Sequence, residues 1–359
     1  MKYKSEIQES LLNWYGAVKR DLPWRKTQDP YKIWISEVML QQTLVETVKG
    51  YYKRFLETFP TVQDLAESED ELLMKMWEGL GYYSRARNLK RAARMIVEEH
   101  DGIMPNNLSQ IRKLPGIGPY TAGAVLSIAY GKAVPAVDGN VIRVYSRLFK
   151  IEGAVDTTPI KKVIDEIACA YVDQSDPSSY NQSLMELGAT ICIPKNPRCL
   201  ACPVTEYCKA YAEGIQKELP KKSPKKPKKE VDLIAALIKK DDEFLILKRP
   251  PEGLLPDLWS FPSIEIENGG VSLEREIDLC LEKFSEELGQ EVVFKEKLGT
   301  ATHIFTHIKW SIKVLEFEWF SGMLPDFPEM KWILESDIES YAFPTAYKKA
   351  IKAGGLTQS

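Results

Sequence analysis

The pattern of apolar and polar positions changes character near residue 230. Before that point, apolar residues recur at helical spacing, for example across 44–55, 69–81 and 84–100. After it, short runs rich in branched and aromatic residues alternate with turn residues, as in strands, and a single helical pattern interrupts them at 273–288. We therefore predict a multidomain chain, with an all-α domain first and a small α+β domain second.

The change of pattern coincides with a segment that shows no apolar periodicity. Residues 217–229 hold seven lysines and three prolines, a composition that stays extended and exposed. We place the helical domain at 1–216, an interdomain linker at 217–230 and the second domain at 231–359. The linker either only spaces the domains or also follows a polyanion.

Composition and charge narrow the class of protein. The chain has 359 residues, 44% of them apolar and 28% charged, which is typical of a soluble globular protein with more than one core. Residues 1–229 hold 34 lysines and arginines against 27 acidic residues, whereas 230–359 hold 14 against 24. A basic first half suits a polyanionic partner such as nucleic acid. No apolar run reaches about eighteen residues and the start lacks a signal-peptide pattern, so we expect a cytoplasmic protein without membrane contact, at the nucleoid if its partner is DNA.

Four of the six cysteines form a cluster with short intervals. Their spacing is C-x6-C-x2-C-x5-C, and their positions are Cys192, Cys199, Cys202 and Cys208. In a cytoplasmic chain this spacing indicates metal ligation rather than disulfides. Four thiolates suit either tetrahedral zinc or a [4Fe–4S] cluster, and the compact loop without histidine favours iron–sulfur. The two isolated cysteines, Cys169 and Cys280, are expected to be buried as small apolar residues.

Two helix starts carry clear signals. Asp29 followed by proline combines an N-cap residue with proline at the first helical position. The stretch "LPGIG" at 114–118 places Gly116 and Gly118 directly before a helix that begins near Pro119. The two glycines permit positive φ and close approach, so backbone N–H groups at this helix start can bind an anion. On a basic domain, we expect that anion to be a DNA phosphate.

This glycine turn, the acid Asp138 in "AVDGNVIRV" and the four-cysteine loop at 192–208 together resemble the helix-hairpin-helix superfamily of DNA glycosylases. Within it, "EVMLQQT" and "WEGLGYYSRARNL" are similar to segments of the adenine DNA glycosylase (MutY) family, and the likeness spans almost the whole chain. The resemblance implies base excision repair of double-stranded DNA in which adenine is mispaired with 8-oxoguanine or guanine. It also implies a [4Fe–4S] cluster on the four cysteines and a monomeric enzyme.

Excision of a purine base requires two carboxyl groups with different tasks. The base must leave protonated, the positive charge that develops on the sugar needs a carboxylate close by, and the nucleotide must first be flipped out of the stack. Glu37 is the candidate acid, because it lies in the apolar run "IWISEVML", where burial would raise its pKa and keep it protonated. The alternative is a glutamate that faces solvent. The resemblance implies that Glu37 protonates adenine at N7.

Asp138 is the candidate partner, which we expect to stay ionised and to stabilise or capture the cationic sugar. The segment "DGNVIRV" equally fits a helix N-cap at Asp138, and both roles are compatible. The resemblance implies that Tyr120 and Asn140 orient the two acids by hydrogen bonds. Relatives that also nick the strand carry a lysine at the position of Tyr120 for Schiff-base chemistry. A tyrosine cannot form that intermediate, so a monofunctional glycosylase is expected.

The resemblance also assigns residues that contact the excised strand. Trp24 and Arg25 would line the pocket for the flipped adenine, although Trp24 equally fits a plain core position. Gly116 and Gly118 would present backbone N–H groups to the phosphates.

Three further residues are assigned to the gap that the flipped base leaves. Gln42, Leu80 and Tyr82 would fill it and press on the opposite base; otherwise the stretch around Leu80 is an ordinary helix end with buried aromatics. After "LQQT" the family usually carries a polar or basic residue, and Leu44 stands there in this chain. Because of this departure, we do not assign Leu44 the family's contact near the lesion strand.

The second domain resembles a Nudix fold, which raises a nucleotide pyrophosphatase as a rival function. Such enzymes hold magnesium with the helix motif R-E-x2-E-E-x-G. Aligned on "EELG", the Arg-Glu pair falls on Glu282 and Lys283, so the metal site is broken and the domain is expected to read the opposing base. Phe305, Thr306 and His307 occupy the stretch where the family contacts 8-oxoguanine, typically with serine in the middle. The alternative there is a strand-end turn with a buried phenylalanine.

Three functions follow from these observations. The favoured one is excision of adenine opposite 8-oxoguanine or guanine. A glycosylase for a different mismatch or lesion on the same scaffold stays open, as does a catalytically silent DNA-binding iron–sulfur protein. Excision assays on duplexes with different target bases separate the two glycosylases. Loss of activity in Asp138→Asn with mismatch binding retained would exclude the silent protein.

Overall fold

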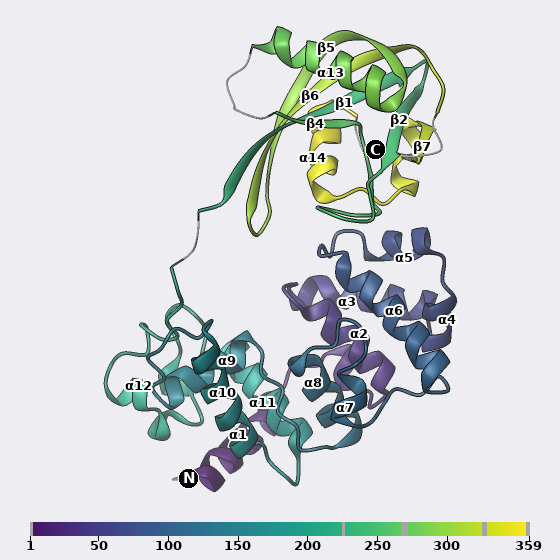
Figure 1. Ribbon diagram of the computed structural model, residues 1–359. Coiled ribbons are helices and arrows are strands. Elements are labelled where there is room, and N and C mark those ends of the chain that lie inside the picture. Colours follow the sequence, from purple (N-terminus) through teal and green to yellow (C-terminus); the bar gives the residue numbers. More distant parts are fainter. Residues whose placement is uncertain (1–2, 225–226, 267–271, 325–328, 357–359) are drawn as a thin grey trace. The chain divides into compact units, whose positions relative to one another are not determined.

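The computed structural model describes residues 3–224, 227–266, 272–324 and 329–356. The chain divides into two compact units. The helical unit holds residues 1–68 and 84–225, and the sheet unit holds residues 69–83 and 226–359. One unit is all-α and the other combines a sheet with helices, which confirms the predicted fold class (Figure 1). Among the described residues, no helix is both long enough and apolar enough to span a membrane.

The helical unit consists of α-helices joined by short loops. In chain order these are α1 (Lys4–Val18), α2 (Pro30–Leu40), α3 (Val45–Thr58), α4 (Val62–Glu67), α6 (Ser84–Glu99), α7 (Leu108–Ile111), α8 (Pro119–Tyr130), α9 (Gly139–Leu148), α10 (Thr158–Tyr171), α11 (Pro177–Thr190) and α12 (Lys209–Ala212). Three short 3-10 turns are η1 (Pro23–Arg25), η2 (Cys199–Ala201) and η3 (Thr205–Tyr207). No strand occurs among residues 3–224, as the sequence pattern predicted.

Local signals determine where these helices begin. The Asp29 side chain caps α2 by accepting hydrogen bonds from the backbone N–H groups of Tyr31 and Lys32, with Pro30 at the first helical position. This confirms the predicted helix start, since the cap satisfies N–H groups that have no partner inside the helix. α8 begins at Pro119, directly after the glycine turn, as predicted.

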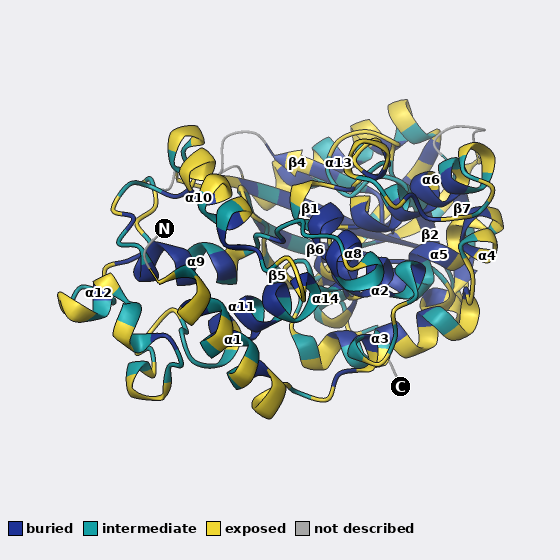
Figure 2. Cartoon of the chain, turned by 90° about the horizontal axis from the view of Figure 1, so that it is seen from below, coloured by how far each residue is buried: buried dark blue, intermediate teal, exposed yellow. Residues whose placement is uncertain are grey.

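Close packing between α8 and the segment after it determines where Asp138 lies. α2 and α8 are buried over most of their surface (Figure 2). A Cβ atom added to Gly123 in α8 would lie 2.0 Å from the carbonyl oxygen of Pro135. Only glycine therefore permits this close approach, which brings the segment leading to Asp138 against α8.

The sheet unit is built around a mixed sheet whose central strand is β1 (Lys229–Lys240). The other strands are β2 (Glu243–Lys248), β3 (Trp259–Ser260), β4 (Ser263–Ile266), β5 (Gln290–Ile304), β6 (Ile308–Gly322) and β7 (Met330–Leu334). The strand order is β3-β2-β1-β6-β5, with β4 paired to β1 and β7 paired to β2. β1 runs parallel to β6 and antiparallel to β2 and β4.

Two helices cover opposite faces of this sheet. Alternate residues of β1 point to opposite faces, so Leu233 and Leu237 belong to one core and Ile234 and Ile238 to the other. The first core includes α14 (Thr345–Ala353), and the second includes α13 (Leu273–Leu288). A 3-10 segment, η4 (Glu335–Ser340), precedes α14.

The sequence pattern located α13 correctly but missed α14. The prediction of a single helix in this domain was wrong, because the apolar residues of α14 extend over only nine positions after a proline. A stretch of two helical turns is too short for periodicity to separate it from a turn.

Residues 69–83 group with the sheet unit rather than with the helices around them in sequence. They form α5 (Asp70–Trp77) and a loop. The helix ends earlier than the predicted 69–81, because Gly79 has φ 94° and Gly81 has φ 69°. Glu78 accepts a hydrogen bond of 3.1 Å from the backbone N–H of Phe343 and forms a 3.1 Å ion pair with Lys348.

The predicted linker is only partly exposed. Leu219 is buried, and its carbonyl oxygen accepts a hydrogen bond from Arg147. The carbonyl oxygen of Lys221 accepts a 3.0 Å hydrogen bond from the backbone N–H of Val155. The first part of the lysine-rich segment is therefore attached to the helical unit. Its last residue, Lys229, already pairs with β6.

Candidate active site

A cavity of about 180 Å³ opens in the helical unit. Its wall includes side chains from η1, α2, α8, α11 and the start of α9. The sequence-predicted residues that line it are Trp24, Arg25, Glu37, Tyr120, Asp138 and Asn140. Further lining residues that the sequence analysis did not single out include Arg20, Gln182, Met185 and Glu186.

Glu37 is buried in the wall of this cavity, with 5% of its surface exposed. The Tyr120 hydroxyl donates a hydrogen bond to its Oε2 atom. Burial raises the pKa of Glu37 to about 7; the hydrogen bond from Tyr120 and the charge of Arg25 act to lower it, and Asp138 acts to raise it. The solvent-facing alternative is therefore excluded, and the predicted desolvation of this carboxyl is confirmed.

Asp138 is the N-cap of α9. Its Oδ1 accepts hydrogen bonds from the backbone N–H groups of Asn140 and Val141, at 2.9 and 2.8 Å, and its Oδ2 accepts one from Asn140 Nδ2 at 2.7 Å. The cap role is confirmed, and the same carboxyl borders the cavity. Burial raises the pKa of Asp138, and the hydrogen bonds from Val141 and Asn140 act against that rise. The ionised state expected for Asp138 stays a prediction.

Tyr120 and Asn140 contact one acid each. Tyr120 reaches Glu37 from α8, and Asn140 reaches Asp138 from the first turn of α9. Asn140 also accepts a 2.7 Å hydrogen bond from Arg143, whose Nε donates to the carbonyl oxygen of Cys192 at 2.7 Å. The two acids thus have separate hydrogen-bond partners.

Trp24 and Arg25 lie together in η1. Trp24 is buried, lines the cavity and packs edge-on against Tyr52 at 5.5 Å between ring centroids. It is therefore a core residue and a cavity residue at once. Arg25 turns its guanidinium toward α11, where Nη2 donates to Glu186 at 2.7 Å.

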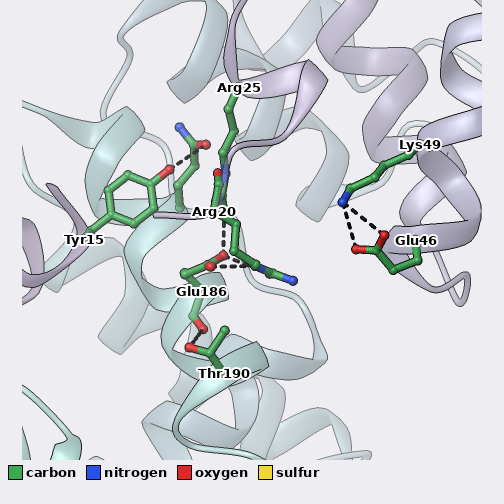
Figure 3. Close-up of polar contacts among 8 residues, drawn as sticks. Tyr15, Arg20, Arg25, Glu46, Lys49, Glu186 and Thr190 are labelled. Atoms are coloured by element: carbon green, nitrogen blue, oxygen red, sulfur yellow. Dashed lines mark hydrogen bonds and ion pairs between the residues drawn. The ribbon is translucent and has the colours of Figure 1, made fainter. Parts of the chain in front are cut away.

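Glu186 and Arg20 are the main residues that the sequence analysis missed. Figure 3 shows both arginines of the wall pointing at the Glu186 carboxylate. Arg20 Nε and Nη2 donate to the two carboxylate oxygens at 2.6 and 2.9 Å. The second half of α11 is apolar at 184–189 except for Glu186. An acid among apolar helix residues is the same signal that identified Glu37, and it would have pointed to Glu186.

Of the two glycines in the turn, only Gly116 adopts a positive φ. Gly116 has φ 76°, and a Cβ atom there would lie 2.8 Å from Cβ of Asn88, so glycine is required. Gly118 is the N-cap of α8 with φ −83° and ψ 180°, an extended conformation open to any residue. The expectation that both glycines serve positive φ was therefore wrong for Gly118. Its position still places it beside the first N–H groups of α8, which lack partners within the helix.

The residues assigned to the gap in the DNA differ in exposure. Gln42 is exposed with φ 58°, and Tyr82 is half-exposed with φ 48°. Leu80 is buried, with 6% of its surface exposed, so an intercalating role requires that it move. Leu44, the departure from the family pattern, is the N-cap residue of α3 and is 79% exposed.

Phe305, Thr306 and His307 form the turn between β5 and β6. The backbone N–H of Phe305 donates to the carbonyl oxygen of Ile308 at 2.8 Å, which closes the turn. The Phe305 ring is half-buried against Trp310, whereas Thr306 and His307 are exposed. The Thr306 hydroxyl lies 2.9 Å from the Tyr82 hydroxyl, within the sheet unit. The predicted strand-end turn is therefore present, and Thr306 and His307 are exposed on it. Contact of this turn with 8-oxoguanine stays a prediction.

The four clustered cysteines border one small cavity, together with Arg147. Among the described residues, no group of three or more cysteine, histidine or acidic side chains converges closely enough to hold a single metal ion. By its chemistry, a donor set of four thiols that border a common cavity fits a [4Fe–4S] cluster. Arg147 donates to the Sγ atom of Cys192 at 3.3 Å and to the carbonyl oxygen of Ile193 at 2.8 Å.

The two isolated cysteines differ in their exposure to solvent. Cys280 is buried in α13, as predicted, but Cys169 is exposed. The expectation for Cys169 was wrong because the buried face of α10 runs through Ile164, Ala168 and Tyr171, and Cys169 falls beside that face.

Comparison with known proteins agrees with this geometry. Residues 35–168 match the family model described as HhH-GPD superfamily base excision DNA repair protein, and residues 233–353 match the NUDIX domain. A structure of a thermostable thymine-DNA glycosylase superposes with a TM-score of 0.54 and 32% identity, over 59% of this chain and 98% of that one.

Two relatives extend the likeness over both units. An adenine DNA glycosylase of Arabidopsis thaliana is 39% identical over 86% of this chain, which spans 56% of that protein's length. The adenine DNA glycosylase of Homo sapiens is 34% identical, with 96% of this chain and 73% of that protein covered. Identity of this extent, over a helical unit and a sheet unit in the same order, shows that the chain belongs to the adenine DNA glycosylase family.

Proposed function

We propose that the protein is a monofunctional DNA glycosylase. It flips adenine out of double-stranded DNA in which the base is mispaired with 8-oxoguanine or guanine, removes it by hydrolysis and leaves an abasic site. The observation that carries this proposal is the cavity that both Glu37 and Asp138 border, with the Glu37 carboxyl buried. The substrate class comes from the relatives, which are named adenine DNA glycosylases.

Glu37 acts as the general acid in this proposal. A pKa of about 7 keeps much of the carboxyl protonated near neutral pH, where an ordinary glutamate would have lost its proton. Because the Tyr120 hydroxyl donates to Oε2, the transferable proton resides on Oε1. That proton passes to N7 of the flipped adenine, the bond from C1′ to N9 breaks, and its electron pair leaves with the base.

Asp138 supports the sugar that remains. Its carboxylate lies in the cavity wall beside Asn140 and stabilises the positive charge that develops at C1′. Water then adds to C1′, and the proton that it releases is taken up by the Glu37 carboxylate, which restores the acid. The product is a neutral adenine and an abasic sugar.

The absence of strand cleavage rests on Tyr120. Schiff-base chemistry needs an amine within reach of C1′, and a phenol supplies none. The Tyr120 hydroxyl is instead engaged with Glu37 in the cavity wall. We therefore assign Tyr120 and Asn140 to orienting the acids.

The DNA is held outside the cavity. We assign the N–H groups at the start of α8, next to Gly116 and Gly118, to phosphate oxygens. Gln42 and Tyr82 are placed in exposed, positive-φ turns that suit contact with the gap in the duplex. The exposed Thr306 and His307 at the β5–β6 turn are assigned to 8-oxoguanine on the opposite strand.

We assign a [4Fe–4S] cluster to the four cysteines. The donor set is four thiols around one cavity, and Arg147 binds the loop through hydrogen bonds to Cys192 and Ile193. A bound cluster would supply a structural crosslink for the loop at 192–208. The purified protein is expected to be brown and to contain iron; a colourless protein that contains zinc instead would contradict this assignment.

The test is a duplex with a single adenine opposite 8-oxoguanine, analysed on a denaturing gel with and without alkali. We expect strand cleavage only after alkali, because the enzyme leaves an intact abasic strand. Cleavage without alkali would contradict the monofunctional assignment. The variant Glu37→Gln should lose roughly 100- to 10,000-fold in rate.

Two controls separate the alternatives. Asp138→Asn should lose excision yet retain binding to the mispaired duplex. A silent DNA-binding protein would show no excision in either the parent or the variant. A duplex with thymine opposite guanine tests the substrate named for the similar thymine-DNA glycosylase structure. Excision of thymine but not adenine would overturn the proposed substrate.

A further inference from the structure

Glu186 is a charged residue with almost no contact with solvent. It lies in α11, is 1% exposed and borders the cavity. Its carboxylate accepts three short hydrogen bonds, from Arg20 Nε at 2.6 Å, Arg20 Nη2 at 2.9 Å and Arg25 Nη2 at 2.7 Å (Figure 3). Arg25 Nη1 also donates to the carbonyl oxygen of Arg20 at 3.1 Å. The two arginines are therefore linked both through Glu186 and directly.

This ion-pair network differs from surface pairs in the same region. Figure 3 also shows Glu46 paired with Lys49, where the glutamate side chain is 81% exposed. Water screens the attraction between the two charges of such a pair, so the pair contributes little to the stability of the fold. Glu186 is buried, so removing its charge would leave guanidinium groups at the cavity without a counter-ion, and their field would act through a medium of low dielectric.

The field of these arginines bears directly on Glu37. The groups that face Glu37 are Tyr120 from α8, Asp138 from the start of α9 and Arg25 from η1. Of these, Arg25 favours the charged form of Glu37, which opposes its use as an acid. Arg25 is also the residue that Glu186 binds.

We propose that Glu186 is a positioning residue of this active site: it holds Arg20 and Arg25 in the cavity wall and cancels the charge that would otherwise drive the proton from Glu37. The inference rests on the proposed function, in which Glu37 donates that proton. In this proposal, α11 supplies the charge that balances the two arginines, which neither Glu37 nor its hydrogen-bond partner Tyr120 does.

Glu186 itself carries its charge throughout the working range. Burial acts to raise the pKa of Glu186, but the hydrogen bonds from Arg20 and Arg25 outweigh it, and the pKa lies below its ordinary value. The counter-charge is therefore constant while Glu37 titrates near pH 7.

The test is the pH profile of single-turnover adenine excision by the full-length protein. Glu37 works in its protonated form, so the rate falls on the alkaline side as Glu37 loses its proton. In Glu186→Gln we expect this alkaline limb to move to lower pH by about one unit, since an uncompensated cation favours the carboxylate. The double variant Glu186→Gln with Arg20→Gln restores the net charge of the network and should return the limb toward its original position.

Several outcomes would overturn the proposal. A uniform loss of rate at every pH, with the limb unmoved, would mean that Glu186 only supports the fold. The control Asp21→Asn breaks the exposed pair between Asp21 and Lys26, in the same segment as Arg20, and should leave the limb in place. If Glu186→Gln does not fold, Arg25→Gln gives the complementary test, because removing the cation should move the limb to higher pH, and an unmoved limb would contradict the inference.

A readout without DNA separates this inference from the proposed function. The protonated Glu37 carboxyl can be followed by infrared difference spectroscopy of the free protein, with Glu37→Gln as the reference. Glu37 in Glu186→Gln should lose its proton at lower pH than in the parent protein. A protein that excises no adenine but shows this shift would refute the proposed function alone, and active protein without the shift would refute the role of Glu186 alone.

Discussion

At the scale of single residues, the chemistry of this site depends on four influences on one carboxyl group. Burial and the nearby Asp138 favour the neutral form of Glu37, whereas Tyr120 and Arg25 favour the charged form. The result is a pKa of about 7, between that of a free glutamate and that of a fully isolated buried acid. A group with this pKa can both give up and regain a proton near neutral pH, which is what an acid that turns over must do.

The first residue-scale prediction concerns Tyr120→Phe. The hydroxyl that donates to Glu37 stabilises the carboxylate, so its removal should raise the pKa of Glu37 and move the alkaline limb of excision to higher pH. The maximum rate should fall at the same time, because the carboxyl loses the contact that orients it. Single-turnover rates between pH 5 and 9 measure both effects. A limb that moves to lower pH would show that the hydroxyl does not act on Glu37 in this way.

A second residue-scale prediction concerns stability. The pKa of Glu37 is about 7 in the folded protein against an ordinary value of 4.5 for a glutamate, so folding binds a proton at pH values between these two. Stability should therefore fall as pH rises through that window, by roughly 3 kcal/mol in all if no other group responds. In Glu37→Gln this loss is absent, and the variant should be more stable than the parent at pH 8 but not at pH 4. Thermal melts at the two pH values check the sign, with Glu57→Gln on the surface of α3 as the matched control.

Residues of the site were predictable where the signal was local. An acid inside an apolar helical run identified Glu37, and an acid before a glycine and a helix identified the cap at Asp138. Arg20 was missed because its contact with Glu186 joins positions 166 residues apart, which no local pattern records. Glu186, by contrast, has the same local signal as Glu37, an acid among apolar helix residues. Cys169 was placed wrongly for a related reason: cysteine is apolar enough for either face, and only the packing of α10 decides.

At the scale of elements, α9 connects the cavity with the cysteine loop. Its N-cap is Asp138, and Arg147 lies in its last turn, 2% exposed. The Arg147 guanidinium donates to the carbonyl oxygens of Ile193, Pro194 and Leu219 at 2.8, 3.0 and 3.0 Å. One planar group with five N–H donors therefore holds the start of the cysteine loop and the start of the lysine-rich segment together.

Arg147→Lys tests this connection. Lysine keeps the charge but cannot reach several carbonyl oxygens in the same plane, so the loop at 192–208 should loosen. We expect the purified variant to retain less than half of the iron of the parent protein and to unfold at a lower temperature. Iron content and visible absorbance measure the first effect, and a thermal melt the second. Lys162→Met on the exposed side of α10 is the control, and iron content equal to the parent in Arg147→Lys would contradict the assignment.

Elements were predictable in proportion to their length and to their end signals. The 16-residue α13 and α6 were located within a residue or two, and the Asp29 cap marked the start of α2. α5 stopped short of its predicted end, because the conformations of Gly79 and Gly81 end the helix and the apolar pattern alone does not show this. Which unit a helix belongs to is a tertiary property, so the pattern could not show that α5 groups with the sheet unit.

At the scale of the whole molecule, the chain passes between its two units more than once. It leaves the helical unit after residue 68, returns at residue 84 and leaves again at residue 225. The lysine-rich segment is thus one of three crossings, and it is the crossing whose exposed lysines a protease can reach. The residues between the first two crossings supply α5 and the loop with Tyr82 to the sheet unit, so the sheet unit contains chain from both sides of that segment.

This connectivity predicts what limited trypsin digestion will do. Cleavage at exposed lysines such as Lys222 or Lys228 should give two fragments that elute together from a sizing column. They stay associated because residues 69–83 of the first fragment pack in the sheet unit formed mainly by the second, with Glu78 bound to the N–H of Phe343 and to Lys348. Glu78→Ala removes both contacts, as well as the pair between Glu78 and Lys75, and leaves the backbone N–H of the buried Phe343 without this acceptor. The cut fragments should therefore separate at a lower salt concentration than those of the parent. Glu57→Ala removes only an exposed pair with Lys53 and should leave the fragments together. Fragments of the parent protein that separate at low salt would show that the lysine-rich segment alone had held the sheet unit, and that α5 does not belong to it in solution.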